Sequence, residues 1–275
     1  MTGKTVVTIV RHGETDYNKA GIVQGHLDVP LNAQGVAQAR VTGRWFAAQG
    51  VRFDEAFSSD LGRARKTAET ILEAQRDAAP LVLDERIRER HLGTMQGKRR
   101  GDPGSDPSTV EPIPHLRARL WAFWDALFPP TGPEPASLAS STSSLAPPSP
   151  ATSASARNGT PAAAARQVLY VSHGAAIREF MSSLAAQAHD VLLPATVEKR
   201  DTPRRVFEMC LPEAEAHALR TGARRIDNCS RTVIEMDWRE EEGRWHGRLL
   251  LYADDAHFVD SSRAPSPTAN ADVVE

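Results

Sequence analysis

The chain has 275 residues, of which 40% are hydrophobic and 25% charged, a composition typical of a soluble globular protein. Its net charge of −2 gives no general attraction to nucleic acid or anionic membranes, so any anion binding must come from a local cluster. Two isolated cysteines make neither a disulfide framework nor a zinc motif, and no signal stretch or membrane span is recognisable. We therefore expect a cytoplasmic protein, with a nuclear location left open.

The first predicted element is a short buried strand over residues 5–10, an apolar run rich in β-branched side chains. The pentapeptide Arg-His-Gly-Glu-Thr follows it at 11–15. In open α/β sheets, ligands bind at the carboxyl ends of the strands. On its own, so short a motif is more often a turn with polar residues facing water.

Helices and strands then alternate, which is typical of an α/β sheet. Hydrophobic spacing and capping residues give the boundaries. The expected elements are a helix over 31–48 capped by Asn32, a strand over 53–58, a helix capped by Asp60, a strand over 81–83 and a helix over 114–128.

Residues 129–165 are mostly Pro, Ser, Ala and Thr, and they contain too few large apolar side chains to form a core. We interpret them as a disordered insertion within a single domain that covers residues 1–260, followed by a disordered tail over 261–275. The remaining predicted elements are a strand over 167–172 with a helix after it, a helix near 212–221, and a hairpin of 231–238 with 246–252. The rest of segment 189–227 has no clear pattern.

Two of the predicted strands end in the same way. Arg11-His12-Gly13 follows the first strand, and His173-Gly174 follows the strand over 167–172. Glycine at such a strand-to-helix turn lets the backbone approach a phosphate closely. Two such strand ends in one chain favour an anion site over two unrelated turns.

Two charged segments accompany these strand ends. Residues 58–68 place Arg63 in the first turn of a helix, where the helix dipole already favours an anion. Residues 84–93, which include Glu89, follow a strand directly. Each segment alone is also compatible with a solvated surface.

The order of these motifs resembles the histidine phosphatase superfamily, which includes cofactor-dependent phosphoglycerate mutases and fructose-2,6-bisphosphatases. Arg-His-Gly-Glu-Thr at 11–15, Ser-Asp-Leu-x-Arg-Ala at 59–64, Glu-Arg-His-x-Gly at 89–93 and the late His-Gly carry the resemblance. Segment 24–32 is similar to the first substrate loop of the family, and Asn-Cys-Ser at 228–230 to a late Asn-x-Ser segment. The resemblance covers roughly residues 5–128 and 167–258. The motifs are most similar to those of the fructose-2,6-bisphosphatase and broad phosphatase branch.

The resemblance implies a three-layer α/β/α fold with a mostly parallel sheet and a late antiparallel hairpin. It implies that His12 is the nucleophile that carries a phosphohistidine intermediate. It places Arg11, Arg63 and His173 around the transferred phosphate. It makes Glu89 the general acid, a role that requires a raised pKa and hence a desolvated position.

Asn18, Gln24, Gly25 and Gly174 match the family's substrate-binding positions. The resemblance implies neither a metal nor another cofactor, and the sequence shows no spacing typical of metal ligands. The expected partner is a small phosphorylated substrate.

Two departures from the mutases of the family favour hydrolysis. Ala175 stands where those mutases have Asn, and Gln24-Gly25-His26 replaces a Gly-Trp-Tyr type of loop. The basic residues at 98–100 either bind a second phosphate or form a solvated loop. We therefore expect a metal-independent phosphatase acting on a small phosphomonoester, with sugar bisphosphates among the candidates. A phosphoglycerate mutase and a regulatory or scaffold protein that retains the fold are the alternatives.

Overall fold

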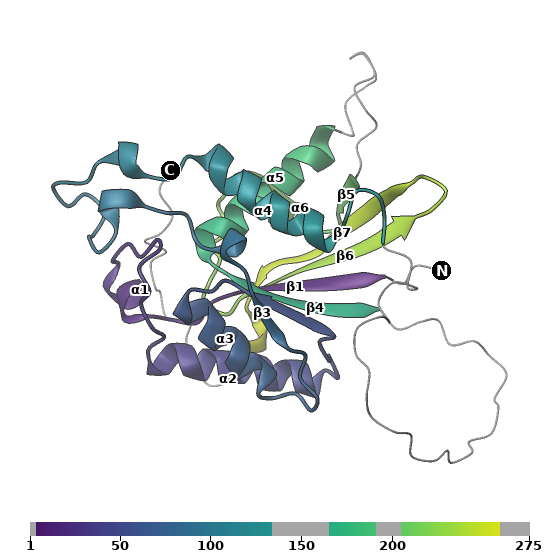
Figure 1. Ribbon diagram of the computed structural model, residues 1–275, viewed down its shortest axis with the longest axis horizontal. Coiled ribbons are helices and arrows are strands. Elements are labelled where there is room, and N and C mark those ends of the chain that lie inside the picture. The colour runs from purple at the N-terminus through teal and green to yellow at the C-terminus, as the bar shows by residue number, and fades with distance from the viewer. Residues whose placement is uncertain (1–3, 134–164, 191–204, 259–275) are drawn as a thin grey trace, which may run out of the picture.

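Seven strands form a single sheet in the order β3-β2-β4-β1-β6-β7-β5 in the computed structural model, which describes residues 4–133, 165–190 and 205–258 (Figure 1). Neighbouring strands are parallel except at β6, which is antiparallel to β1 and β7. The mostly parallel sheet with a late hairpin is thus confirmed. The strands are β1 (Thr5–Arg11), β2 (Glu55–Ser58), β3 (Leu81–Leu83), β4 (Arg166–Ser172), β5 (Arg205–Met209), β6 (Arg231–Arg239) and β7 (Arg244–Asp254).

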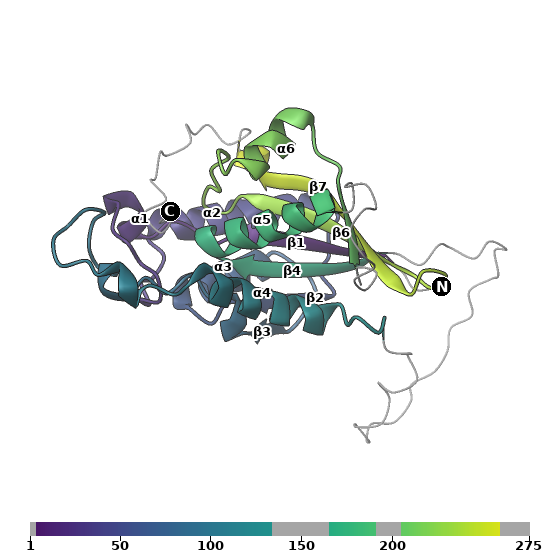
Figure 2. The ribbon, with the colours of Figure 1, turned by 90° about the horizontal axis from the view of Figure 1, so that it is seen from above.

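Helices cover both faces of the sheet. Figures 1 and 2 show α2 and α3 on one face and α4, α5 and α6 on the other. This is the three-layer α/β/α arrangement that the sequence predicted. The helices are α1 (Asp16–Ala20), α2 (Ala33–Ala48), α3 (Gly62–Leu72), α4 (Ile113–Leu127), α5 (Gly174–Asp190) and α6 (Glu213–Arg220).

The strands are apolar on both sides because each face of the sheet has its own core. In β1, Val7 and Ile9 pack with Trp124 of α4 and the apolar side of α5. Val10 lies on the opposite face, in the cluster that contains Phe46 of α2 and the apolar side of α3. Successive side chains of a strand point to opposite faces, so a strand between two helical layers needs an unbroken apolar run.

Most elements lie within a residue or two of their predicted bounds. The side chain of Asn32 accepts a hydrogen bond from the N–H of Gly35 at 2.9 Å and caps α2 as expected. The predicted hairpin is present as β6 and β7. Two elements were not predicted, the short helix α1 and the edge strand β5.

The elements before and after the predicted insertion share one sheet, because β4 lies between β1 and β2. The first residues of that predicted insertion contact the fold. The carbonyl of Pro129 accepts a hydrogen bond from Trp245 Nε1 at 2.8 Å, and Gly132 lies against the ring of Trp238. Residues 134–164, like the predicted tail over 261–275, lie outside the described residues.

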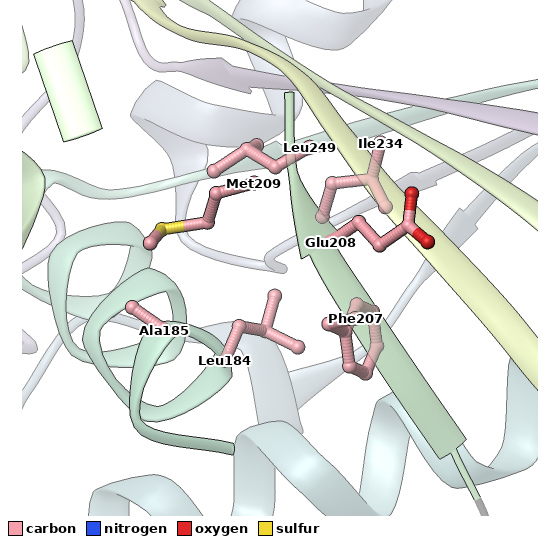
Figure 3. A pocket seen from close by; sticks show the side chains of 7 residues that line it. All are labelled: Leu184, Ala185, Phe207, Glu208, Met209, Ile234 and Leu249. Atoms are coloured by element: carbon pink, nitrogen blue, oxygen red, sulfur yellow. The ribbon is translucent and has the colours of Figure 1, made fainter. Parts of the chain in front are cut away.

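A small apolar pocket lies between α5 and the edge strand β5 (Figure 3). Leu184 and Ala185 line it from the helix, and Phe207 and Met209 line it from the strand. None of its lining residues is among the predicted site residues, which gather at the carboxyl ends of β1 and β4.

Candidate active site

The two predicted His-Gly segments lie side by side because β1 and β4 are parallel neighbours. Arg11 pairs with Ser172 in the register, so His12 and His173 follow at the same edge of the sheet. The N–H of His12 donates to the carbonyl of Ser172 at 2.9 Å. The two imidazole rings are buried, with their centroids 5.2 Å apart.

The His12 ring has the form that a nucleophile needs. Its Nδ1 lies 2.7 Å from the carbonyl oxygen of Gly13, so the proton belongs on Nδ1. Its Nε2 has no hydrogen-bond partner among the described residues. Burial, followed by the charges of Arg63 and Arg11, holds the pKa of His12 well below its usual value. The ring is therefore neutral at neutral pH and keeps a lone pair on Nε2.

This protonation state can be measured directly. At pH 6.5 an ordinary histidine is about half protonated. Because a lowered pKa leaves the neutral form populated down to a lower pH, His12 is expected to be neutral there, with its proton on Nδ1. Long-range ¹H–¹⁵N NMR of the imidazole rings distinguishes the three forms. An imidazolium signal at pH 6.5, or a proton on Nε2, would contradict this assignment.

Arg11 and Arg63 are fully buried, and both are held by backbone carbonyls. Arg11 Nη1 donates to the carbonyl of Ile226 at 2.8 Å. Arg63 Nη1 and Nη2 donate to the carbonyls of Leu27 and Gly25, each at 2.7 Å. These carbonyls fix both guanidinium groups, and their charges act on His12, whose pKa they help to lower.

His173 is the second ring of the site. Burial, then the charge of Arg63, lowers its pKa well below the usual value. Neither of its ring nitrogens has a hydrogen-bond partner among the described residues. The neutral ring thus offers one N–H to a ligand, in a position beside His12.

Helix α3, which carries Arg63, does not begin as predicted. Asp60 is not its cap: the carboxylate of Asp60 is bound by the guanidinium of Arg88, with Nε at 2.7 Å from Oδ1. The N–H of Gly62 instead donates to Asp28 Oδ1 at 2.6 Å. The prediction was wrong because a guanidinium fork is a stronger partner for the Asp60 carboxylate than a backbone N–H. The start of the helix is capped from the first loop, so that loop and α3 are joined next to Arg63.

Glu89 is fully buried, as the predicted general acid must be. Its Oε2 accepts the N–H of Ala175 at 3.0 Å, and its Oε1 accepts the N–H of Ala176 at 2.9 Å. The N–H of Arg90 donates to Oε1 at 2.8 Å. Three backbone donors therefore hold the carboxylate at the start of α5, one turn from His173.

The predicted substrate-binding residues surround the same edge. Asn18 is buried, and its Nδ2 has no hydrogen-bond partner among the described residues. Gln24 Oε1 lies 2.9 Å from Thr15 Oγ1, and the carbonyl of Gly25 accepts a hydrogen bond from Arg63 Nη2. Gly174 is the first residue of α5. The structure thus brings all nine predicted site residues to one edge of the sheet.

Two further residues support the site without having been predicted as part of it. Thr67 Oγ1 accepts the N–H of Gly13 at 2.9 Å and donates to the carbonyl of Arg63 at 2.7 Å. Asn228 Nδ2 donates to the carbonyl of His12 at 2.9 Å. Asn228 was visible only through the resemblance, and a threonine within a helix carries no sequence signal for this role.

Close packing of backbone fixes the turn after β1. A β-carbon on Gly13 would lie 2.5 Å from the carbonyl oxygen of Gly35, the residue at the start of α2. A β-carbon on Gly35 would lie 2.1 Å from the carbonyl oxygen of Glu14. Both neighbours are backbone atoms, which cannot move aside as the end of a side chain can.

Gly13→Ala is therefore expected to destabilise the protein by about 1–3 kcal/mol, the usual cost of overpacking. The shift should also displace the neighbouring His12. Urea denaturation measures the stability loss. A variant as stable as the natural protein would show that the turn and α2 can separate without cost.

Within residues 4–133, 165–190 and 205–258, no three His, Cys, Asp or Glu side chains gather closely enough to hold a metal ion. No helix in this same part of the chain is long and apolar enough to cross a membrane.

Comparison with known proteins agrees with this geometry. Residues 7–141 match the family model of the histidine phosphatase superfamily (branch 1). The chain is 39% identical to fructose-2,6-bisphosphatase TIGAR of Xenopus tropicalis over 136 residues, or 44% of this chain and 49% of that protein. It is 37% identical to a broad-specificity phosphatase of Saccharomyces cerevisiae over 90 residues, or 32% of this chain and 39% of the relative. These matches span less than half the length of each relative.

Solved structures share the fold over almost the whole chain. A mycobacterial glucosyl-3-phosphoglycerate phosphatase superposes with a TM-score of 0.56 at 23% identity, covering 91% of this chain and 99% of its own. A phosphoglycerate mutase of Bacillus anthracis gives a TM-score of 0.59 at 17% identity, with 95% and 98% covered. The chain therefore resembles the histidine phosphatase superfamily, whose family model matches just under half of its residues.

Proposed function

We propose that this protein is a metal-independent phosphatase that hydrolyses a small phosphomonoester through a phosphohistidine at His12. The observation that carries the proposal is the His12 ring itself. It is buried and neutral, its Nδ1 is held by the Gly13 carbonyl, and its Nε2 has no hydrogen-bond partner among the described residues. A nucleophile in this state can attack phosphorus without first losing a proton.

The reaction has two steps. In the first, His12 Nε2 forms a bond to phosphorus while the bond to the ester oxygen breaks, and protonated Glu89 gives its proton to that oxygen. In the second, the Glu89 carboxylate takes a proton from water, which attacks phosphorus and releases phosphate and neutral His12. Glu89 regains its proton, so atoms and charges balance over the cycle.

Side chains from three elements stabilise the transferred phosphoryl group. Arg11 is the last residue of β1, Arg63 lies in the first turn of α3, and His173 directly precedes α5. Positioned cations and N–H donors of this kind contribute several kcal/mol at a phosphoryl-transfer transition state. The two guanidinium groups supply charge that other phosphatases obtain from metal ions.

A phosphoglycerate mutase is the second candidate function, since the superfamily fold is shared with such a mutase. Ala175 argues for hydrolysis. The N–H of Ala175 donates to Glu89 Oε2, and its side chain is a methyl group. Ala175 therefore offers no polar group that could retain a monophosphate for the return transfer.

The substrate class is the least constrained part of the proposal. TIGAR is named a fructose-2,6-bisphosphatase, and a sugar bisphosphate would suit the basic loop at 98–100. Lys98 Nζ donates to the carbonyl of Gly104 at 2.7 Å, while Arg99 is exposed beside the first loop. Both cysteines are free thiols, which suits the reducing cytosol.

One assay separates the candidates. The purified protein is incubated with a panel of phosphorylated metabolites, with and without bisphosphoglycerate. Phosphate release that needs no bisphosphoglycerate supports the phosphatase. Isomerisation of a phosphoglycerate that depends on bisphosphoglycerate would make the protein a mutase, and no turnover of any kind would favour a regulatory or scaffold role.

A further inference from the structure

Arg119, on α4, binds three backbone carbonyls in the segment that ends at Glu89. Its Nη1 donates to the carbonyl of Arg86 at 2.8 Å and to that of Arg88 at 2.7 Å. Its Nη2 donates to the carbonyl of Glu89 at 2.7 Å. One guanidinium therefore fixes the whole approach of the chain to the proposed general acid.

Glu111 holds this guanidinium in place. Arg119 Nε donates to Glu111 Oε1 at 2.8 Å, and Nη2 donates to Oε2 at 2.9 Å. Burial acts to raise the pKa of the Glu111 carboxyl, but the bonds and charge of Arg119 outweigh it and hold the pKa below its usual value. The pair is thus ionised at neutral pH, and the planar fork of Arg119 has one preferred orientation.

The same pair also fixes the residues after Glu89. Glu111 Oε2 accepts the N–H of His91 at 3.0 Å, and the carbonyl of Glu111 accepts Arg90 Nε at 2.7 Å. The backbone on both sides of Glu89 is therefore bound to one partly buried ion pair.

His26 adds a second donor at the Glu89 carbonyl. Its Nε2 lies 2.7 Å from that oxygen, the same oxygen that Arg119 binds. Burial lowers the pKa of His26, so the neutral ring must carry its proton on Nε2 in order to donate. Glu89 is consequently fixed at its backbone by Arg119 and His26, and at its carboxylate by the first N–H groups of α5.

We propose that Arg119, oriented by Glu111, positions the general acid of this protein. The inference rests on the proposed function, since it assigns Arg119 an effect only on the step in which Glu89 moves a proton. The Arg119 guanidinium donates its hydrogen bonds to backbone carbonyls and to Glu111, so it affects the reaction through Glu89. A displacement of about 1 Å in a proton donor can slow its step by roughly 100-fold. Lysine, with a single ammonium group, cannot span three carbonyls and a carboxylate.

The test compares two substrates in variants of the full chain. An alkyl phosphate needs the acid, because its leaving oxygen is strongly basic, whereas p-nitrophenyl phosphate barely needs it. Arg119→Lys and Glu111→Gln are each expected to slow the alkyl phosphate by about 10-fold or more and the aryl phosphate by less than about threefold. Arg117→Lys is the matched control, because Arg117 lies on the same helix with 45% of its side chain exposed and pairs with Glu179 at 3.0 Å. Both of its rates should equal those of the natural protein.

A double variant separates positioning from general damage. Once Glu89 is replaced by Gln there is no acid to position, so Arg119→Lys should slow the alkyl phosphate little further. Equal losses on the two substrates, or a full additional loss in the double variant, would overturn the inference. If Arg119→Lys does not fold by circular dichroism, Glu111→Gln carries the same comparison. If the natural protein and His12→Ala are equally inactive, the proposed function fails and the inference fails with it.

Discussion

His12→Ala is expected to lower phosphate release by roughly 10⁴-fold or more, the loss typical of removing a covalent nucleophile. The alanine removes the proposed nucleophile, His12 Nε2, while Arg11, Arg63 and His173, the proposed phosphate-binding side chains, stay in place. KM should therefore change much less than kcat. Steady-state kinetics with an aryl phosphate measures both quantities.

His217→Ala is the control for this variant, because His217 lies on α6 with its side chain exposed to solvent. It should retain full activity. A residual rate for His12→Ala within about 100-fold of the natural protein would mean that water or another side chain attacks phosphorus directly. Loss of activity in both variants would point to damage outside the site.

Glu89→Gln is expected to have an effect that depends on the leaving group. For an alkyl phosphate the rate should fall by about 10²–10⁴-fold, the usual contribution of a general acid. For p-nitrophenyl phosphate the first step should be nearly unaffected, because that leaving group departs without a proton. A burst of nitrophenol followed by slow turnover is the expected time course, since the second step still lacks its base.

The same substitution should also reduce stability. Three backbone N–H groups point at the two oxygens of the Glu89 carboxylate, and Gln replaces one of those oxygens with an NH₂ group that cannot accept. A loss of about 1–3 kcal/mol is expected from chemical denaturation. The comparison of two substrates within one variant is independent of this loss. Glu85→Gln, at a carboxylate with 76% of its side chain exposed, should change neither rate. Equal slowing of both substrates by Glu89→Gln would contradict its role as the acid.

Local patterns in the sequence were enough to predict most of the fold. The continuous apolar runs of β1 and β4 and the Asn32 cap of α2 depend on near neighbours in the chain. Strand β5 was missed because five residues at a sheet edge give a weak signal, and its parallel partner β7 follows some forty residues later. Helix α1 has a readable start, since Thr15 and Asn18 cap each other, but its five residues are too few for a periodic pattern.

The site shows the same division between local and distant interactions. Sequence motifs identify His12, Arg63 and Glu89, because a strand end, a helix start and a charged segment are local features. The motifs do not show that the first N–H groups of α5 hold the Glu89 carboxylate, or that Asp28 rather than Asp60 caps α3. Arg119 carried no signal at all, since an arginine in an amphipathic helix is usually a surface residue. These contacts join segments far apart in the chain, and only the fold brings them together.

The central claim is that His12 becomes phosphorylated during turnover, and it can be tested by trapping that species. Glu89→Gln is mixed with an aryl phosphate and quenched in alkali within the burst, since the variant should form the intermediate quickly and hydrolyse it slowly. Peptide mass spectrometry is predicted to find one phosphoryl group on His12, stable in alkali and lost in acid. A burst without phosphorylated His12, or a phosphoryl group on another residue, would contradict the mechanism.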